Sequence, residues 1–162
     1  IINCANFGTL YSNGNGASVA GLSQGGCLRI RNSFNKGNIT GYFCGGLVCM
    51  PGSNSLIVDS FNSGDINARW SAGGLLWNDD DKQIIIKNSY SAGTIKADQY
   101  SGDLIAGGSP LVENSYYTAS NDNRFGEQKT LAEIIEIMRA IWDNNIWDFD
   151  NLDENGNPTL RN

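Results

Sequence analysis

One short phrase recurs along the chain and constrains its fold more than any other feature. Three clear copies occupy residues 30–39, 57–66 and 86–95, with a variant over residues 2–10 and a broken copy over residues 112–117. Each copy contains an Asn or Asp, and this column comprises Asn3, Asn32, Asp59, Asn88 and Asn114. The steps along the column are 29, 27, 29 and 26 residues. A nearly constant period of this size predicts stacked coils of one supersecondary unit.

A second phrase lies between the copies and keeps the same period. Residues 20–22, 45–48, 73–76 and 102–105 align as a small residue, a Gly and then apolar residues, although Asp103 replaces the expected Gly in the fourth. Both phrases are short, are bounded by Gly and use Ile, Val, Phe and Tyr, which is typical of strands and turns. We therefore predict an all-β fold, a right-handed parallel β-solenoid of about 4–5 coils.

Stacking in register places equivalent residues above one another. The Asn/Asp column should form a ladder in which side-chain amides hydrogen-bond along the solenoid axis. An aromatic column should form from Phe34, Phe61, Tyr90 and Tyr116, with Ala5 as its first step. The recurring Gly8, Gly37, Gly64 and Gly93 predict positive φ angles or a close backbone approach. The alternation leaves open whether the serines or the aromatic rings point inward.

The pattern changes after Tyr117. Residues 120–126 read as a loop, and Thr130 with Glu133 then forms a capping-box pattern. The following apolar residues recur at helical spacing, which predicts an amphipathic helix of about three turns. We expect this helix to lie across the open end of the solenoid, because an uncovered last coil leaves an exposed strand edge. Residues 1–118 are thus predicted as repeats and residues 119–162 as a C-terminal cap with a closing tail.

The paired phrases resemble the GLUG repeat, with residues 45–48 (Gly-Gly-Leu-Val) closest to its core. The resemblance covers residues 1–118. Cys49 replaces the usual following Gly, and residues 20–23 and Asp103 depart from the pattern. Residues 147–149 and 155–160 are similar to the endings of GLUG regions. GLUG repeats occur in bacterial surface and adhesin-like proteins and ahead of the protease domain of immunoglobulin A-cleaving metalloendopeptidases, so the resemblance implies an extracellular repeat module without catalytic residues.

Length and charge agree with such a module. The 162 residues suit one ordinary domain, and 20 glycines suit a turn-rich β protein. A net charge of −6 with no His argues against a nucleic-acid partner, which requires clustered Lys and Arg. No apolar run reaches membrane-spanning length, so no membrane insertion of this segment is expected. The chain begins at Ile1 without a Met or a signal peptide, so we expect a fragment or a processed piece of a protein with further domains. The resemblance and the composition, and not a leader sequence, predict that this protein is exported or lies at the cell surface.

Neither a metal site nor a cofactor is predicted. Cys4, Cys27, Cys44 and Cys49 lack paired C-x-x-C spacing, and no His is available for zinc. Cys4 occupies the Ser column, which favours a small buried thiol, while a disulfide involving the other three stays open. Asp79, Asp80 and Asp81 could bind a hard cation, but a solvated acidic loop neutralised by Lys82 is the favoured interpretation. Residues 151–156 imitate the start of an EF-hand loop, and a simple turn is favoured there too.

Catalysis is not expected, because no His can serve as a base and most carboxylates fall in repeat columns or loops. A paired-carboxylate enzyme acting on polysaccharides is the third alternative. The candidate ligand-binding residues are Trp70, Trp77, Tyr100 and the acidic loop of Asp79, Asp80 and Asp81. We predict a non-catalytic stalk or adhesin-like module that contacts a host or cell-surface protein or a glycan. The second alternative is a carbohydrate-binding or accessory region of a secreted protease.

Overall fold

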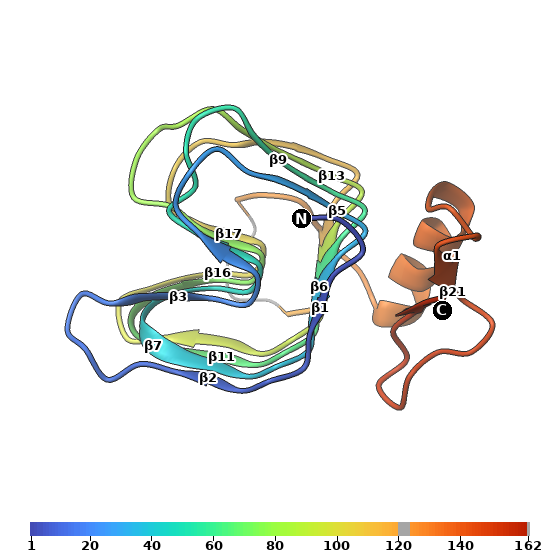
Figure 1. The fold of residues 1–162 in the computed structure, drawn as a ribbon, viewed down its shortest axis with the longest axis horizontal. Coiled ribbons are helices and arrows are strands. Elements are labelled where there is room, and N and C mark those ends of the chain that lie inside the picture. Colours follow the sequence, from blue (N-terminus) through green and yellow to red (C-terminus); the bar gives the residue numbers. More distant parts are fainter. Residues whose placement is uncertain (120–123, 162) are drawn as a thin grey trace.

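The computed structural model describes residues 1–119 and 124–161, which form a parallel β-solenoid of about four turns with one helix beside it (Figure 1). Four residues of the predicted loop at 120–126 therefore lie outside the described residues. The pairings between successive coils are parallel, and equivalent residues of the repeat pair with one another, as the repeat predicted; Phe34 pairs with Phe61, and Phe61 pairs with Tyr90. The fold class is thus confirmed.

The coils stack their strands into four parallel sheets. The first, called the aromatic sheet, contains β1 (Ala5–Asn6), β6 (Phe34–Asn35), β10 (Phe61–Asn62), β14 (Tyr90–Ser91), β19 (Tyr116–Tyr117) and β20 (Glu127–Gln128). The second contains β2 (Leu10–Tyr11), β3 (Ser18–Ala20), β7 (Ile39–Gly45), β11 (Ile66–Gly73), β15 (Ile95–Ala97) and β16 (Tyr100–Gly102). The third contains β4 (Ser23–Gln24), β8 (Val48–Cys49), β12 (Leu76–Trp77) and β17 (Ile105–Ala106). The fourth contains β5 (Arg29–Arg31), β9 (Ser55–Val58), β13 (Ile84–Lys87) and β18 (Leu111–Glu113).

The sharp corner before the aromatic sheet is made by the Asn/Asp column. All five of its residues have positive φ angles, between 44° and 53°. Asn and Asp tolerate this left-handed conformation better than other non-glycine residues. The predicted ladder joins the last three members: Asn88 Nδ2 donates to Asp59 Oδ1 at 3.0 Å, and Asn114 Nδ2 donates to Asn88 Oδ1 at 3.4 Å. The column therefore shapes the corner and also links neighbouring coils.

The Gly column after the aromatic sheet serves a different purpose. None of Gly8, Gly37, Gly64 and Gly93 has a positive φ. A Cβ on Gly64 would lie 2.1 Å from the Gly37 carbonyl oxygen of the neighbouring coil. Of the two predicted reasons for these glycines, close approach between coils is the correct one.

The aromatic column lies on the outer face of the solenoid. The rings of Phe34 and Phe61 stack with centroids 4.9 Å apart, and the rings of Phe61 and Tyr90 do the same. The serines of the same phrase are buried instead, and each accepts from a backbone N–H of the preceding coil; Ser33 N donates to Ser60 Oγ at 3.2 Å. The structure thus resolves the alternation: the serines are internal and the rings face outward.

The C-terminal unit covers this outward aromatic column. Helix α1 (Leu131–Ile141) begins with the predicted capping box of Thr130 and Glu133. Its buried side chains pack with the strand pair β21 (Trp147–Asp148) and β22 (Thr159–Leu160) and with Phe149 against the aromatic column. The Trp142 indole donates to the Asn88 carbonyl at 2.8 Å. The expectation that the helix crosses the open end of the solenoid is wrong: the helix lies on the flank, because the stacked rings that face outward offer an apolar surface there (Figure 1).

Each coil is folded into two lobes with separate cores. One lobe lies between the third and fourth sheets around residues such as Leu47, Leu75 and Ile86. The other lies inside the bent second sheet around Ile39, Ile66 and Ile95. The second and third sheets also pack back to back between the lobes, where Cys49, Trp77 and Ala106 contact Phe43. The candidate site lies at the edge of this contact between the second and third sheets, beside Trp77.

Candidate ligand-binding site

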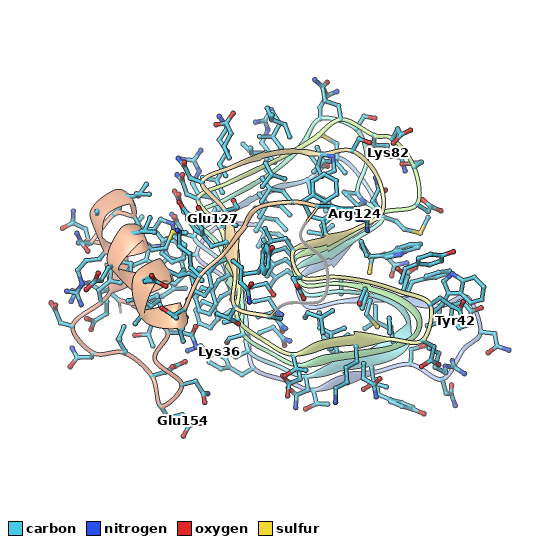
Figure 2. The ribbon with its side chains drawn as sticks, turned by 180° about the vertical axis from the view of Figure 1, so that it is seen from behind. Lys36, Tyr42, Lys82, Arg124, Glu127 and Glu154 are labelled. Atoms are coloured by element: carbon cyan, nitrogen blue, oxygen red, sulfur yellow. The ribbon has the colours of Figure 1, made fainter. Side chains whose placement is uncertain are left out.

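A pocket of about 290 Å³ opens where strands β11 and β16 approach the loop after β12. We call it the aromatic pocket; it is lined by Trp70, Ser71, Trp77, Asn78, Asp79, Tyr100, Gly107 and Arg124. Four of the six residues predicted as ligand-binding, namely Trp70, Trp77, Asp79 and Tyr100, therefore lie around one hollow. Figure 2 shows Tyr42, which stacks on Trp70, on the side of the solenoid opposite the helix.

A backbone irregularity accounts for the position of Trp70. The pairing of β11 with β7 shifts register between Ala68 and Ser71. Such a bulge bends the strand and re-aims side chains. Trp70 is 41% exposed, and its ring lies nearly parallel to that of Tyr42 with centroids 5.9 Å apart. The bulge therefore places an aromatic face at the rim of the pocket.

The other two rings differ in exposure. Tyr100 is 63% exposed, whereas Trp77 is only 5% exposed. Trp77 stacks on Phe43 with ring centroids 4.1 Å apart, which ties the pocket to the seam between the sheets. Trp77 thus forms a fixed inner wall, and Trp70 and Tyr100 supply the rings that solvent reaches.

Phe43 and Tyr42 support the site, although neither was predicted from the sequence as a site residue. Arg69 lies over the Tyr42 ring at 5.7 Å and donates to the carbonyls of Asn13 and Gly14 at 2.8 and 3.0 Å. The loop after β2 is thereby fixed beside the aromatic cluster. The signal that could have identified Tyr42 was its spacing, because it precedes Trp70 by 28 residues, close to one period of the repeat. In the structure Tyr42 lies opposite the bulge that contains Arg69 and Trp70.

Polar groups complete the pocket. The Asn78 side chain is buried, and its Nδ2 donates to the Asp80 carbonyl. Within the described part of the chain, Asn78 Oδ1 has no hydrogen-bond partner. Buried acceptors are normally satisfied, so this unpartnered oxygen in a residue that lines the pocket is unusual. Asp79 and Arg124 add one negative and one positive charge to the lining.

Only one residue of the acidic loop lines the pocket. Asp80 forms an ion pair with Lys82 at 2.9 Å, and Asp81 accepts from Ser109 Oγ at 3.2 Å. Among residues 1–119 and 124–161, no group of three or more His, Cys, Asp or Glu side chains is arranged to hold a metal ion. The loop thus brings Asp79 to the pocket and uses the other two carboxylates elsewhere.

The EF-hand-like segment forms a turn. Asp153 Oδ1 accepts from the backbone N–H groups of Asn155 and Asn157 at 2.9 and 2.8 Å, and its Oδ2 pairs with Lys36 at 2.6 Å. These contacts hold the pKa of Asp153 below its usual value, against the opposing effect of partial burial. The Asp153 carboxylate therefore fixes the C-terminal unit to the solenoid.

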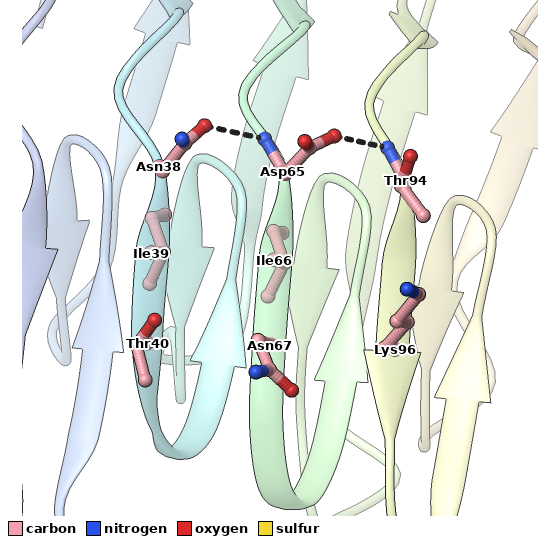
Figure 3. Close-up of a pocket in the computed structure, with 8 residues that line it drawn as sticks. All are labelled: Asn38, Ile39, Thr40, Asp65, Ile66, Asn67, Thr94 and Lys96. Carbon is pink, nitrogen blue, oxygen red and sulfur yellow. Dashed lines mark hydrogen bonds between the residues drawn. The ribbon is translucent and has the colours of Figure 1, made fainter.

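A second hollow, of about 260 Å³, lies over three coils of the second sheet (Figure 3). Its polar residues connect the coils: Asp65 N donates to Asn38 Oδ1 at 3.0 Å, and Thr94 N donates to Asp65 Oδ1 at 2.8 Å. A third, of about 420 Å³, lies between the solenoid and the C-terminal unit beside Lys36 and Asn157. The carboxylates and amides of these hollows act as structural links.

All four cysteines are free thiols. Cys4 was expected to be buried, but it is exposed because the first coil has a neighbour on one side only. Burial raises the pKa of Cys44 to about 12, and burial and then the nearby Cys44 raise that of Cys49 still further. A thiol reacts as its thiolate, so these two buried side chains act as core residues.

Asp59 illustrates the use of carboxylates in the repeat. Burial raises the pKa of Asp59, and the hydrogen bond from Asn88 opposes that shift. This carboxylate therefore belongs to the corner ladder and does not face the aromatic pocket.

Within the described residues, no helix has both the length and the apolar character needed to cross a bilayer.

Comparison with known proteins supports the fold at the level of architecture. No family model matches the chain, and neither does any curated protein. Among solved structures, the chain is similar to a Bacteroides ovatus protein provisionally assigned as an immunoglobulin A1 protease, with a TM-score of 0.65 and 18% identity. The match covers 82% of this chain and 57% of the other, so the chain spans little more than half the length of its structural neighbour.

Proposed function

We propose that the chain is a non-catalytic interaction module, a stalk or adhesin-like domain, of a bacterial exported or cell-surface protein. The aromatic pocket is the observation that carries this proposal, because Trp70 and Tyr100 expose large rings on a scaffold stacked in register. Exposed aromatic side chains are enriched where proteins bind partners. The carboxylates of the repeat, such as Asp59 and Asp65, are by contrast held in hydrogen bonds between coils.

A second candidate is an accessory region of a secreted protease that cleaves immunoglobulin A. The likeness in fold to the Bacteroides ovatus protein favours it, since that chain is considerably longer than the part matched. In this setting the module would present the protease to its target or to a surface, and the same pocket would make the contact. The two candidates share a non-catalytic binding role and differ in the remainder of the parent protein.

Surface binding tests the proposal. The fluorescently labelled chain should bind mucin-coated plates or epithelial cells, and Trp70→Ala and Tyr100→Ala should reduce binding about tenfold, as for central aromatic contacts. Tyr11→Ala is the matched control, because Tyr11 is 72% exposed and does not line the pocket. Cleavage of immunoglobulin A1 or of polysaccharides by the purified chain would contradict a non-catalytic role, as would the absence of any surface binding.

A further inference from the structure

The walls of the aromatic pocket combine two accessible rings with one enclosed ring. Trp70 and Tyr100 are 41% and 63% exposed, and Trp77 closes the inner side at 5% exposure. The face of an aromatic ring carries a partial negative charge. The C–H bonds on one face of a pyranose are slightly positive and can lie flat against such a ring. These walls thus suit a ligand with a flat, weakly polarised C–H face.

The polar groups of the pocket suit hydroxyl groups. Asp79 presents a carboxylate and Ser71 a hydroxyl beside the rings. Asn78 also lines the pocket, and its buried Oδ1 has no hydrogen-bond partner in the described chain. An unsatisfied buried acceptor is costly, so Asn78 gains a hydrogen bond if its side chain turns to accept from a ligand hydroxyl. A few placed polar groups within aromatic walls are typical of small-molecule sites.

The charges of the pocket and of the chain indicate a neutral ligand. Asp79 and Arg124 contribute opposite charges to the lining, so neither an anion nor a cation matches it. The net charge of −6 also repels acidic ligands at long range. A volume of about 290 Å³ lies at the lower end of the range for small-molecule sites. We infer that the aromatic pocket binds a neutral terminal sugar unit of a glycan.

This inference rests on the proposed interaction role and names its ligand class. A glycan array provides the direct test, with galactose-, N-acetylgalactosamine-, mannose-, glucose- and fucose-terminated disaccharides beside sialylated and sulfated ones. We expect binding to at least one neutral sugar and none to the acidic series. Titration of the best sugar should change tryptophan fluorescence, because Trp70 and Trp77 line the pocket.

Substitutions locate the sugar. Trp70→Ala and Tyr100→Ala should each weaken the affinity about tenfold or more. Trp70→Phe should retain part of it, because a smaller ring face remains. Tyr11→Ala should bind like the unaltered chain, since this exposed tyrosine lies outside the pocket. Circular dichroism and thermal unfolding of each variant exclude loss of the fold as the cause.

The outcomes separate this inference from the proposed function. Surface binding that depends on Trp70 but survives periodate oxidation of the surface sugars would overturn the glycan ligand and leave an interaction module with a protein partner. Sugar binding unchanged by Trp70→Ala and Tyr100→Ala would overturn the pocket as its location. A preference for sialylated or sulfated sugars would overturn the neutral class. If the chain bound no sugar on the array and also bound no mucin-coated plate or cell surface, both proposals would be overturned.

Discussion

Asn35 and Asn62 stand next to the aromatic column and form an inner ladder within the solenoid. Asn6 Nδ2 donates to Asn35 Oδ1 at 2.6 Å, and Asn35 Nδ2 donates to Asn62 Oδ1 at 2.7 Å. Asn35 and Asn62 are fully buried, and each also donates to the carbonyl of the Gly two residues later. Ser91 takes the next place but is too short to continue the ladder, and its Oγ has no partner among the described residues.

Asn62→Ala should therefore lower the free energy of unfolding by about 1–3 kcal/mol, because the substitution removes one of the two acceptors of the Asn35 amide in the core. Asn67→Ala is the control: Asn67 is exposed on the same coil, and a change within about 0.5 kcal/mol is expected. Urea denaturation followed by circular dichroism measures both. Equal stability of the two variants would show that the inner ladder contributes little.

The sequence predicted the outer columns better than the inner ones. The aromatic and Asn/Asp columns were recognisable because each keeps one chemical class through the repeat. The inner ladder was missed because Asn35 and Asn62 lie beside the more conspicuous aromatic residues, and because the column changes from Asn to Ser at Ser91. Trp70, Trp77 and Tyr100 could be grouped from their place outside the repeat. The bulge before Ser71 was also encoded, as one extra residue between Ile66 and Gly73 compared with Ile39 and Gly45, but the spacing alone did not show which side chain it would turn outward.

At the scale of elements, the two repeated phrases depend on each other. A Cβ on Gly46 would lie 1.8 Å from the Gly74 carbonyl oxygen and 2.7 Å from Asn62 Cγ. The Gly-Gly turn between the second and third sheets therefore leaves space for the inner Asn ladder. This contact explains why both phrases recur in phase: a coil that carries one needs the other to pack.

The Gly column offers a test with an internal control. Gly64→Ala should destabilise the fold by about 3 kcal/mol or more, because the added Cβ would lie 2.1 Å from the Gly37 oxygen. Gly8→Ala occupies the same column, but the nearest atom to its Cβ would be 3.5 Å away. It should change stability by less than about 1 kcal/mol. Similar losses in both variants, measured by thermal unfolding, would refute close approach as the reason for the column.

The helix shows how far element prediction extends. Thr130, Glu133 and the apolar spacing predicted its start and its length, because capping and periodicity are local properties. Its place on the flank depended on which solenoid face was apolar, and the alternation of Ser and aromatic residues left that open. Local sequence determines that residues 131–141 form a helix, whereas packing against distant residues determines where that helix lies.

At the scale of the molecule, the C-terminal unit contacts several coils at once. Lys36 of the second coil pairs with Asp153 at 2.6 Å, and Tyr90 of the fourth donates to Asn157 Oδ1 at 3.0 Å. Trp142 stacks near Phe61 of the third coil and Tyr90 of the fourth, with ring centroids 6.3 and 5.8 Å away. Repeat proteins otherwise hold each unit through its neighbours alone.

Trp142→Ala should lower the free energy of unfolding by about 3–5 kcal/mol, because it removes a fully packed ring and the bond to the Asn88 carbonyl. The variant should also bind a hydrophobic dye through the uncovered aromatic column. Glu136→Ala, at an exposed position of the same helix, should be neutral within about 0.5 kcal/mol. A loss below about 1 kcal/mol in Trp142→Ala would mean that the C-terminal unit is a loosely held appendage.

The lateral attachment of the C-terminal unit also determines how the module responds to force. Tension applied to this unit would reach the second and the fourth coils together, through Lys36 and Tyr90. The contacts on the flank would then be loaded in parallel and would have to shear at the same time. A cap seated on the end would instead pass the whole load to the last coil and peel it away first. The position of one short helix thus favours mechanical resistance in a protein built from small repeated coils.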